Sequence, residues 1–143
     1  MAKPEIVEVP PSQSVTNFSQ VADANVKAIG PSSHAVKAGG LVFVSGQPGI
    51  RPSDPATGAK GSTFAEQGRQ AFENLRVVLE AAGSGMDRVV NTTCLLGDVS
   101  YFPELNALFA EYFAASPPAR MAMQVPLPLG LLFSIGCVAT VGE

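Results

Sequence analysis

The stretch STFAEQGRQAFENLRVVLEAAG, residues 62–83, carries the clearest structural signal in the chain. Thr63 followed three residues later by Glu66 is the pattern of a capping box and predicts a helix start, while Gly83 predicts the helix end. Apolar residues recur between these signals at helical spacing: Ala71, Leu75, Val78, Leu79 and Ala82. We therefore expect an amphipathic helix that packs on a sheet.

The segments around this helix alternate between strand and helix signals. HAVKAGGLVFVSG, residues 34–46, predicts a hairpin that turns at Gly39 and Gly40, and VVNTTCLL, residues 89–96, predicts a β-branched strand. A second helix is expected after Ser100 as N-cap, with one buried stripe: Leu105, Leu108, Phe109, Tyr112 and Phe113. Strands over residues 119–125 and 131–141 complete an α+β pattern, with two helices on one face of a mixed sheet.

Length and composition narrow the class of protein. At 143 residues the chain is expected to form one domain, with residues 1–28 as an N-terminal extension and residues 29–143 as the folded unit. No apolar run is long enough for a membrane span, and the N-terminus lacks a signal-peptide pattern, so we expect a cytoplasmic protein. The net charge of -3 disfavours a nucleic-acid partner.

Metal and cofactor sites are not indicated. The chain has one histidine, His34, and two cysteines in apolar runs, Cys94 and Cys137, so ligand spacing for a metal is missing. The glycine-rich loop after residue 46 lacks a phosphate-binding pattern, and no cofactor is expected. His34 has an ordinary pKa in the range useful for acid–base catalysis, but a surface or packing role is the favoured interpretation.

Arg120 lies in SPPARMAMQV, residues 116–125, among residues that look buried. Strand alternation separates Arg120 and its neighbours at alternate positions from Met121 and Met123, and we expect the methionine side to face the core. If strands 119–125 and 131–141 pair, small residues would leave a hollow beside Arg120: Ala122, Ser134 and Gly136. Such a hollow would suit a small carboxylate. The alternative is a structural ion pair between Arg120 and Glu104 or Glu111.

Five segments in order resemble the RidA/YjgF family of imine and enamine deaminases: IGPSSHAVKAGG, LVFVSGQ, EQGRQAFENLRVVLEAAG, VVNTTCLLGDVSYFPELNALFAEYF and PPAR. The resemblance covers residues 29 to about 139. It implies a chorismate-mutase-like fold and a homotrimer whose sheets form a central barrel, with ligand clefts between subunits. It also implies hydrolysis of reactive 2-imino or 2-enamino acids to keto acids and ammonia.

The resemblance further assigns roles to individual residues. Arg120 matches the arginine that holds the substrate carboxylate, Ser45 and Gly46 match the cleft-lining VSGQ segment, and Asn106 matches the asparagine of an NxxY-like motif whose tyrosine is Phe109 here. Ser32 occupies the position of a cleft tyrosine in the family pattern. The implied partner is a small metabolite that bears a carboxylate.

The end of the chain departs from the family pattern. The family run resembling VEIEAIA carries a glutamate that positions the attacking water, whereas the matching run here is FSIGCVA, with Ser134 at the glutamate position and Gly136 in place of a second acid. A serine hydroxyl orders water but is a poor base. Two hypotheses follow: a deaminase with a non-standard site at Arg120 and Ser134, and a non-catalytic carboxylate-binding or regulatory protein.

Overall fold

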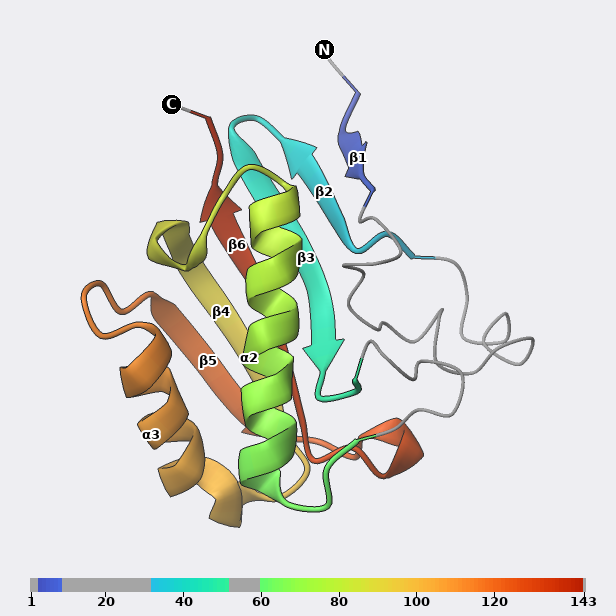
Figure 1. Cartoon of the computed structure of the whole chain (residues 1–143), viewed down its shortest axis with the longest axis vertical. Helices are drawn as coiled ribbons and strands as arrows, with labels where there is room; N and C mark the ends of the chain where they lie inside the picture. The colour runs from blue at the N-terminus through green and yellow to red at the C-terminus, as the bar shows by residue number, and fades with distance from the viewer. Residues whose placement is uncertain (1–2, 9–31, 52–59, 143) are drawn as a thin grey trace.

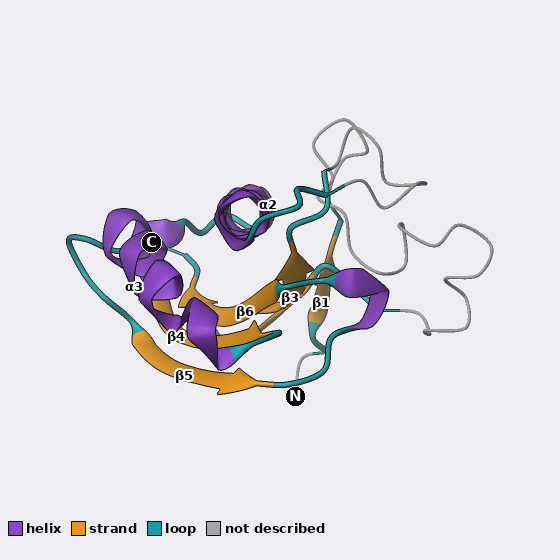
Figure 2. Cartoon of the chain, turned by 90° about the horizontal axis from the view of Figure 1, so that it is seen from below, coloured by secondary structure: helices purple, strands orange, loops and turns teal. Residues whose placement is uncertain are grey.

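The computed structural model describes residues 3–8, 32–51 and 60–142. These residues form one six-stranded sheet, and two helices cover one of its faces (Figure 1 and Figure 2). The strands are β1 (Glu5–Val7), β2 (Ala35–Ala38), β3 (Leu41–Pro48), β4 (Val89–Leu96), β5 (Ala119–Gln124) and β6 (Phe133–Thr140). The helices are α2 (Phe64–Ala81) and α3 (Phe102–Tyr112). Short 3₁₀ turns precede β4 at Met86–Arg88, α3 at Val99–Tyr101 and β6 at Pro128–Gly130.

The strand order is β1-β2-β3-β6-β4-β5. β4 and β5 pair in parallel and every other neighbouring pair is antiparallel, so the expected mixed α+β sheet is confirmed. β1 was not predicted: residues of the N-terminal segment pair with β2 at the sheet edge. The expected boundary between residues 28 and 29 lies outside the described residues.

Helix α2 begins and ends where the sequence predicts. The Thr63 hydroxyl accepts a hydrogen bond from the Glu66 backbone N–H at 3.2 Å, and the Glu66 carboxylate accepts one from the Thr63 N–H at 3.2 Å. Gly83 has φ +82°, a conformation that favours glycine after a helix. All five residues of the predicted apolar stripe are buried, and they belong to the hydrophobic core between the helix and the sheet.

Helix α3 begins differently from the prediction. The Asp98 carboxylate accepts a hydrogen bond from the Ser100 N–H at 2.8 Å, and a 3₁₀ turn then leads into the helix, so Asp98 and not Ser100 is the capping side chain. Four residues of the predicted stripe are buried and Tyr112 is partly buried. No helix among the described residues is both long and apolar enough to cross a membrane.

The core lies between the two helices and the sheet, and the opposite face of the sheet is open (Figure 2). Cys94 and Cys137 are buried free thiols, and burial raises their pKa values to about 11 and about 12. The predicted core orientation of β5 is wrong. Met121 and Met123 are 61% and 37% exposed, because their side of the strand is the open face.

Candidate functional site

The six residues predicted for the site line two separate cavities. Arg120 and Asn106 line a groove of about 550 Å³ between the end of α3 and β5, called here the Arg120 groove. Its remaining walls are apolar: Phe109, Ala110, Phe113, Ala114, Pro117 and Pro118. Ser32, Ser45, Gly46 and Ser134 line a second cavity of about 440 Å³, the Ser134 cleft, whose other walls are Leu95, Val125, Pro126, Leu127 and Pro128.

The two cavities belong to different faces of the sheet. Arg120 is aligned with the fully buried Thr92 of β4, and its guanidinium stacks on rings of α3, so it lies on the helix-covered face. Ser134 alternates with the core residues Phe133 and Ile135 and therefore points to the open face. One chain does not bring Arg120 and Ser134 into one cavity.

The predicted hollow between β5 and β6 does not form. β4 pairs with β5 on one side and with β6 on the other, so it separates the two strands. Ala122 packs against the core from the helix side, whereas Ser134 and Gly136 line a depression on the open face. The expectation failed because alternation within each strand does not say which strands are neighbours.

Arg120 is held by two aromatic rings and one amide, all on α3. Its guanidinium carbon lies 5.1 Å from the centre of the Phe102 ring and 4.8 Å from the centre of the Phe109 ring. Its Nη1 donates a hydrogen bond to the Asn106 Oδ1 at 2.9 Å. Positions 102, 106 and 109 lie on one side of a helix, so one side of α3 supplies all three contacts to Arg120.

The structural ion pair considered for Arg120 is absent from the described residues. Glu111 pairs with Arg69 instead, at 2.6 Å and 3.0 Å in a two-pronged arrangement, and no carboxylate of residues 3–8, 32–51 or 60–142 lies within 4.0 Å of Arg120. The exposed guanidinium thus keeps its positive charge uncompensated by any described acidic group. Aromatic faces stabilise a cation without cancelling its charge, which leaves it available to an anion.

The Ser134 cleft contains an irregular part of β3. The pairing register between β3 and β6 shifts between Val44 and Gln47, which places Ser45 and Gly46 at the bulge. The Ser45 hydroxyl donates to the Ser33 carbonyl at 2.6 Å, and the Gln47 side-chain amide donates to the Ser45 carbonyl at 2.9 Å. These bonds fix the bulge from both sides.

Gly46 and Ser134 lie close together across this bulge. A Cβ atom added at Gly46 would lie 2.9 Å from the Ser134 Oγ, so a larger residue at position 46 would require the Ser134 hydroxyl to shift. The Ser134 hydroxyl makes no hydrogen bond to any described residue and is 5% exposed in the cleft wall. Packing also favours glycine at position 136, since a Cβ atom there would lie 3.1 Å from the Val44 carbonyl oxygen.

His34 lies beside the cleft without lining it. Its carbonyl accepts a hydrogen bond from the Ser45 N–H at 3.0 Å, directly before β2. Burial lowers the pKa of the imidazole, with an opposing effect from Glu8. Within the described ranges, no group of three histidine, cysteine or acidic side chains is arranged to hold a metal ion.

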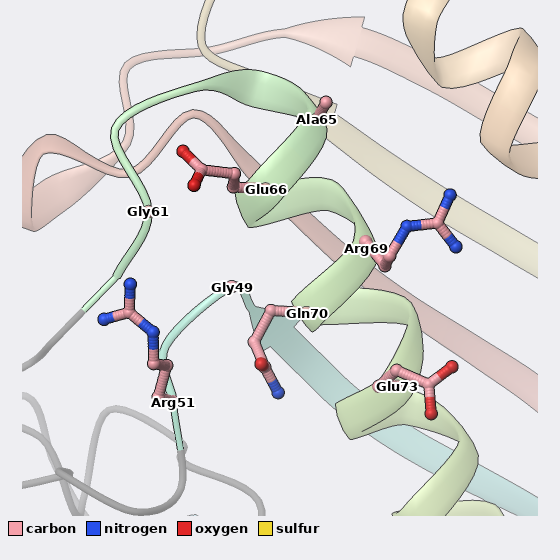
Figure 3. A pocket seen from close by; sticks show the side chains of 8 residues that line it. All are labelled: Gly49, Arg51, Gly61, Ala65, Glu66, Arg69, Gln70 and Glu73. Atoms are coloured by element: carbon pink, nitrogen blue, oxygen red, sulfur yellow. The ribbon is translucent and has the colours of Figure 1, made fainter.

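A third hollow, of about 470 Å³, runs along α2 near the end of β3 (Figure 3). The charged side chains that α2 contributes to it have structural partners. Glu66 caps the helix, Arg69 pairs with Glu111 of α3, and Glu73 accepts hydrogen bonds from Tyr112 and Arg76. We assign no ligand to this hollow, because these contacts account for the charges of Glu66, Arg69 and Glu73.

Comparison with known proteins decides the family. The model of the Endoribonuclease L-PSP family matches residues 22–141. The chain belongs to this family, the RidA/YjgF family. It is 40% identical over 116 residues to the human protein named 2-iminobutanoate/2-iminopropanoate deaminase, and the aligned region covers 80% of this chain and 83% of the human protein.

Solved structures of RidA/YjgF proteins show the same fold. RidA from an Antarctic Psychrobacter superposes with a TM-score of 0.79 at 31% identity, over 96% of this chain and 99% of the other. TdcF of E. coli, solved with bound serine, superposes with a TM-score of 0.79 at 25% identity, again over 96% and 99%. The resemblance inferred from the five segments and the expected fold class are therefore confirmed.

The sequence interpretation missed two parts of the RidA/YjgF chain around these cavities. The sequence predictions include no role for Phe102, and they place Phe109 in the buried stripe and at the tyrosine position of the NxxY-like motif but not against Arg120, although the spacing of both rings with Asn106 places all three on one helical side. In the apolar wall formed by residues 125–128, Val125 is predicted as the end of a strand and residues 126–128 as a connection between strands. Its signal was the sequence VPLP, in which two prolines restrict the backbone next to apolar side chains.

Proposed function

We propose that this RidA/YjgF protein hydrolyses 2-imino and 2-enamino acids to 2-keto acids and ammonia. The observation that carries the proposal is the state of Arg120: an exposed guanidinium, stacked on two rings, bonded to a neutral amide and without a carboxylate partner among the described residues. Such a group binds a carboxylate through two parallel hydrogen bonds. The name of the human relative and the serine bound to TdcF agree with a ligand that bears a carboxylate.

The proposed working form is a homotrimer. Two observations support assembly: the open sheet face exposes Phe43, Met121 and Met123, and the predicted site residues of one chain are divided between two faces. Large apolar side chains on an uncovered face are typical of an interface. In the proposed trimer, the Arg120 groove of one subunit adjoins the Ser134 cleft of the next, so each complete site uses two copies.

The proposed chemistry needs few protein groups. Arg120 holds the carboxylate, water adds to the C2 carbon of the C=N bond, and the nitrogen takes up protons and leaves as ammonia while C2 becomes the ketone. An enamine substrate first takes a proton on carbon to become the imine. Ser134 orients the water through its unengaged hydroxyl. Imines are intrinsically reactive, so positioning contributes most of the required acceleration.

A coupled assay tests the proposal. An amino-acid oxidase generates the imino acid in solution, and its disappearance is followed with and without the protein. The wild type is expected to accelerate hydrolysis, and Arg120→Ala is expected to lower kcat/KM by about a hundredfold or more, since one charged bidentate contact is lost. Arg69→Ala is the matched control, because Arg69 is an exposed arginine already paired with Glu111. Equal rates for buffer and wild type would refute the proposal.

A second function is favoured by one specific observation. None of the side chains lining the Ser134 cleft is a base at neutral pH. A non-catalytic protein that binds small carboxylates as a sensor or regulator would need only Arg120. It predicts a thermal shift with 2-keto acids that Arg120→Ala abolishes, together with no acceleration of imine hydrolysis, so the same pair of variants separates the two functions.

A further inference from the structure

The walls of the Ser134 cleft are unusually uniform in chemistry. Apart from backbone groups they consist of small side chains on one side and aliphatic or proline side chains on the other, and none of the described residues that line the cleft is ionisable. The Arg120 groove likewise has Arg120 as its one charged lining residue. A ligand that uses both cavities therefore meets one cation, a few hydroxyl and amide groups, and otherwise apolar surface.

The apolar wall is anchored rather than loose. Leu127 packs against the buried residues Ile50 and Leu131. The Val125 N–H donates to the Leu96 carbonyl at 3.0 Å, which joins the start of this wall to the end of β4. Pro126 and Pro128 restrict the backbone on either side of Leu127. A preformed apolar wall binds an apolar group without the cost of ordering a loop.

The wall of the Ser134 cleft that faces this apolar wall is formed by small residues. Ser32, Ser45, Gly46 and Ser134 are all small, and a Cβ atom at position 46 would lie only 2.9 Å from the Ser134 Oγ. The resulting cleft of about 440 Å³ lies within the usual range for small-molecule sites and exceeds what a methyl group would occupy.

We propose that the preferred substrates are imino and enamino acids with an apolar side chain of the size of leucine, methionine or phenylalanine, and that this side chain occupies the Ser134 cleft. This inference rests on the proposed function. Each methylene that becomes buried strengthens binding by about fourfold. A charged side chain would lose water and find no opposite charge among the lining residues.

The test compares substrates that differ only in the side chain. Imines generated from alanine, leucine, phenylalanine and lysine are assayed in parallel, and the corresponding keto acids are titrated by calorimetry. We expect kcat/KM for the leucine-derived imine to exceed that for the alanine-derived imine by at least about tenfold, with the lysine-derived imine below both. We expect 4-methyl-2-oxopentanoate to bind at least about tenfold more tightly than pyruvate.

Variants of the apolar wall separate selectivity from folding. Leu127→Asn, and the nearly isosteric Val125→Thr, are expected to lower the preference for 4-methyl-2-oxopentanoate over pyruvate by about fivefold or more. Leu129→Asn is the control, because Leu129 is 47% exposed on the same loop, does not line the cleft and has φ +60°, which asparagine tolerates.

The outcomes are distinguishable from those of the proposed function. If no imine is hydrolysed faster than in buffer, the deaminase proposal fails. The relative affinities for 4-methyl-2-oxopentanoate and pyruvate then still test whether the cleft prefers an apolar side chain. If pyruvate binds as tightly as 4-methyl-2-oxopentanoate, or if Val125→Thr leaves the preference intact, the inference about the side chain is overturned whether or not the protein is an enzyme.

Discussion

The Arg120 Nη1 donates to the Asn106 Oδ1 at 2.9 Å, so a neutral amide occupies the position from which a carboxylate would cancel the charge of the arginine. The resemblance to RidA/YjgF proteins predicted that Asn106 contacts the ligand. The geometry gives it a second task, because it orients the guanidinium while leaving its charge intact. Replacing this amide therefore changes ligand binding in a way that reports on the charge of Arg120.

Asn106→Asp is expected to weaken binding of keto acids by tenfold or more. The new carboxylate would form a charge-assisted bond with Arg120 and compete with the ligand. Asn106→Ala removes the orienting bond alone and is expected to weaken binding less, by about fivefold. Titration calorimetry with one keto acid measures both. Similar losses for the two variants would contradict the role given to the amide.

Phe102→Leu tests the aromatic support of Arg120. The Phe102 ring lies 5.1 Å from the guanidinium carbon, and a stacking contact of this kind contributes about 0.5–1 kcal/mol at an exposed site. We expect a two- to fivefold rise in KM with little change in kcat. Phe102→Tyr retains an aromatic face and should restore the wild-type KM, whereas a purely packing role would make the two substitutions differ only in thermal stability.

Ser134→Ala and Ser134→Glu examine the attack of water. Removing the hydroxyl is expected to lower kcat by about tenfold with KM nearly constant, because the water loses one orienting partner. Introducing a carboxylate at the same position is expected to raise kcat above the wild-type value, since a carboxylate both orders water and accepts a proton. Unchanged kcat in Ser134→Ala would remove this residue from the proposed mechanism.

Stability is expected to decrease in alkaline solution. Burial raises the pKa values of Cys94 to about 11 and Cys137 to about 12, and burial together with a hydrogen bond to Glu73 raises that of Tyr112 to about 12. The unfolded chain loses these protons at lower pH, so their contribution is complete below about pH 8.5 and is lost progressively up to about pH 12.

Urea unfolding between pH 7 and 11 measures this dependence. We expect the midpoint to decrease above about pH 9, and Cys137→Ala to make that decrease shallower. The same burial predicts that a thiol reagent labels neither cysteine in the native protein at pH 8 and labels both after unfolding. Rapid labelling of the native protein would contradict the described burial.

Local signals predicted most of the secondary structure. The capping box at Thr63 and Glu66 and the glycine at position 83 act within one turn of the chain, so they fix the limits of α2 without help from the rest of the fold. The alternation of β6 was equally clear, because one set of its residues is bulky and the other small. The predicted start of α3 is wrong, because Asp98 and Ser100 are both capable N-caps and the sequence does not reveal the 3₁₀ turn over Val99–Tyr101 that contains Ser100.

Alternation by itself determined that Arg120 and Met121 lie on opposite sides of β5. It did not determine which side is buried, because the wholly apolar methionine set favours burial, yet that side is exposed in the folded chain. Tertiary structure decided this: α3 lies over the arginine side with Phe102 and Phe109, and β4 separates β5 from β6. The identity of neighbouring strands and the covered face depend on contacts between distant segments, so only the folded chain placed Arg120 and Ser134 in different cavities.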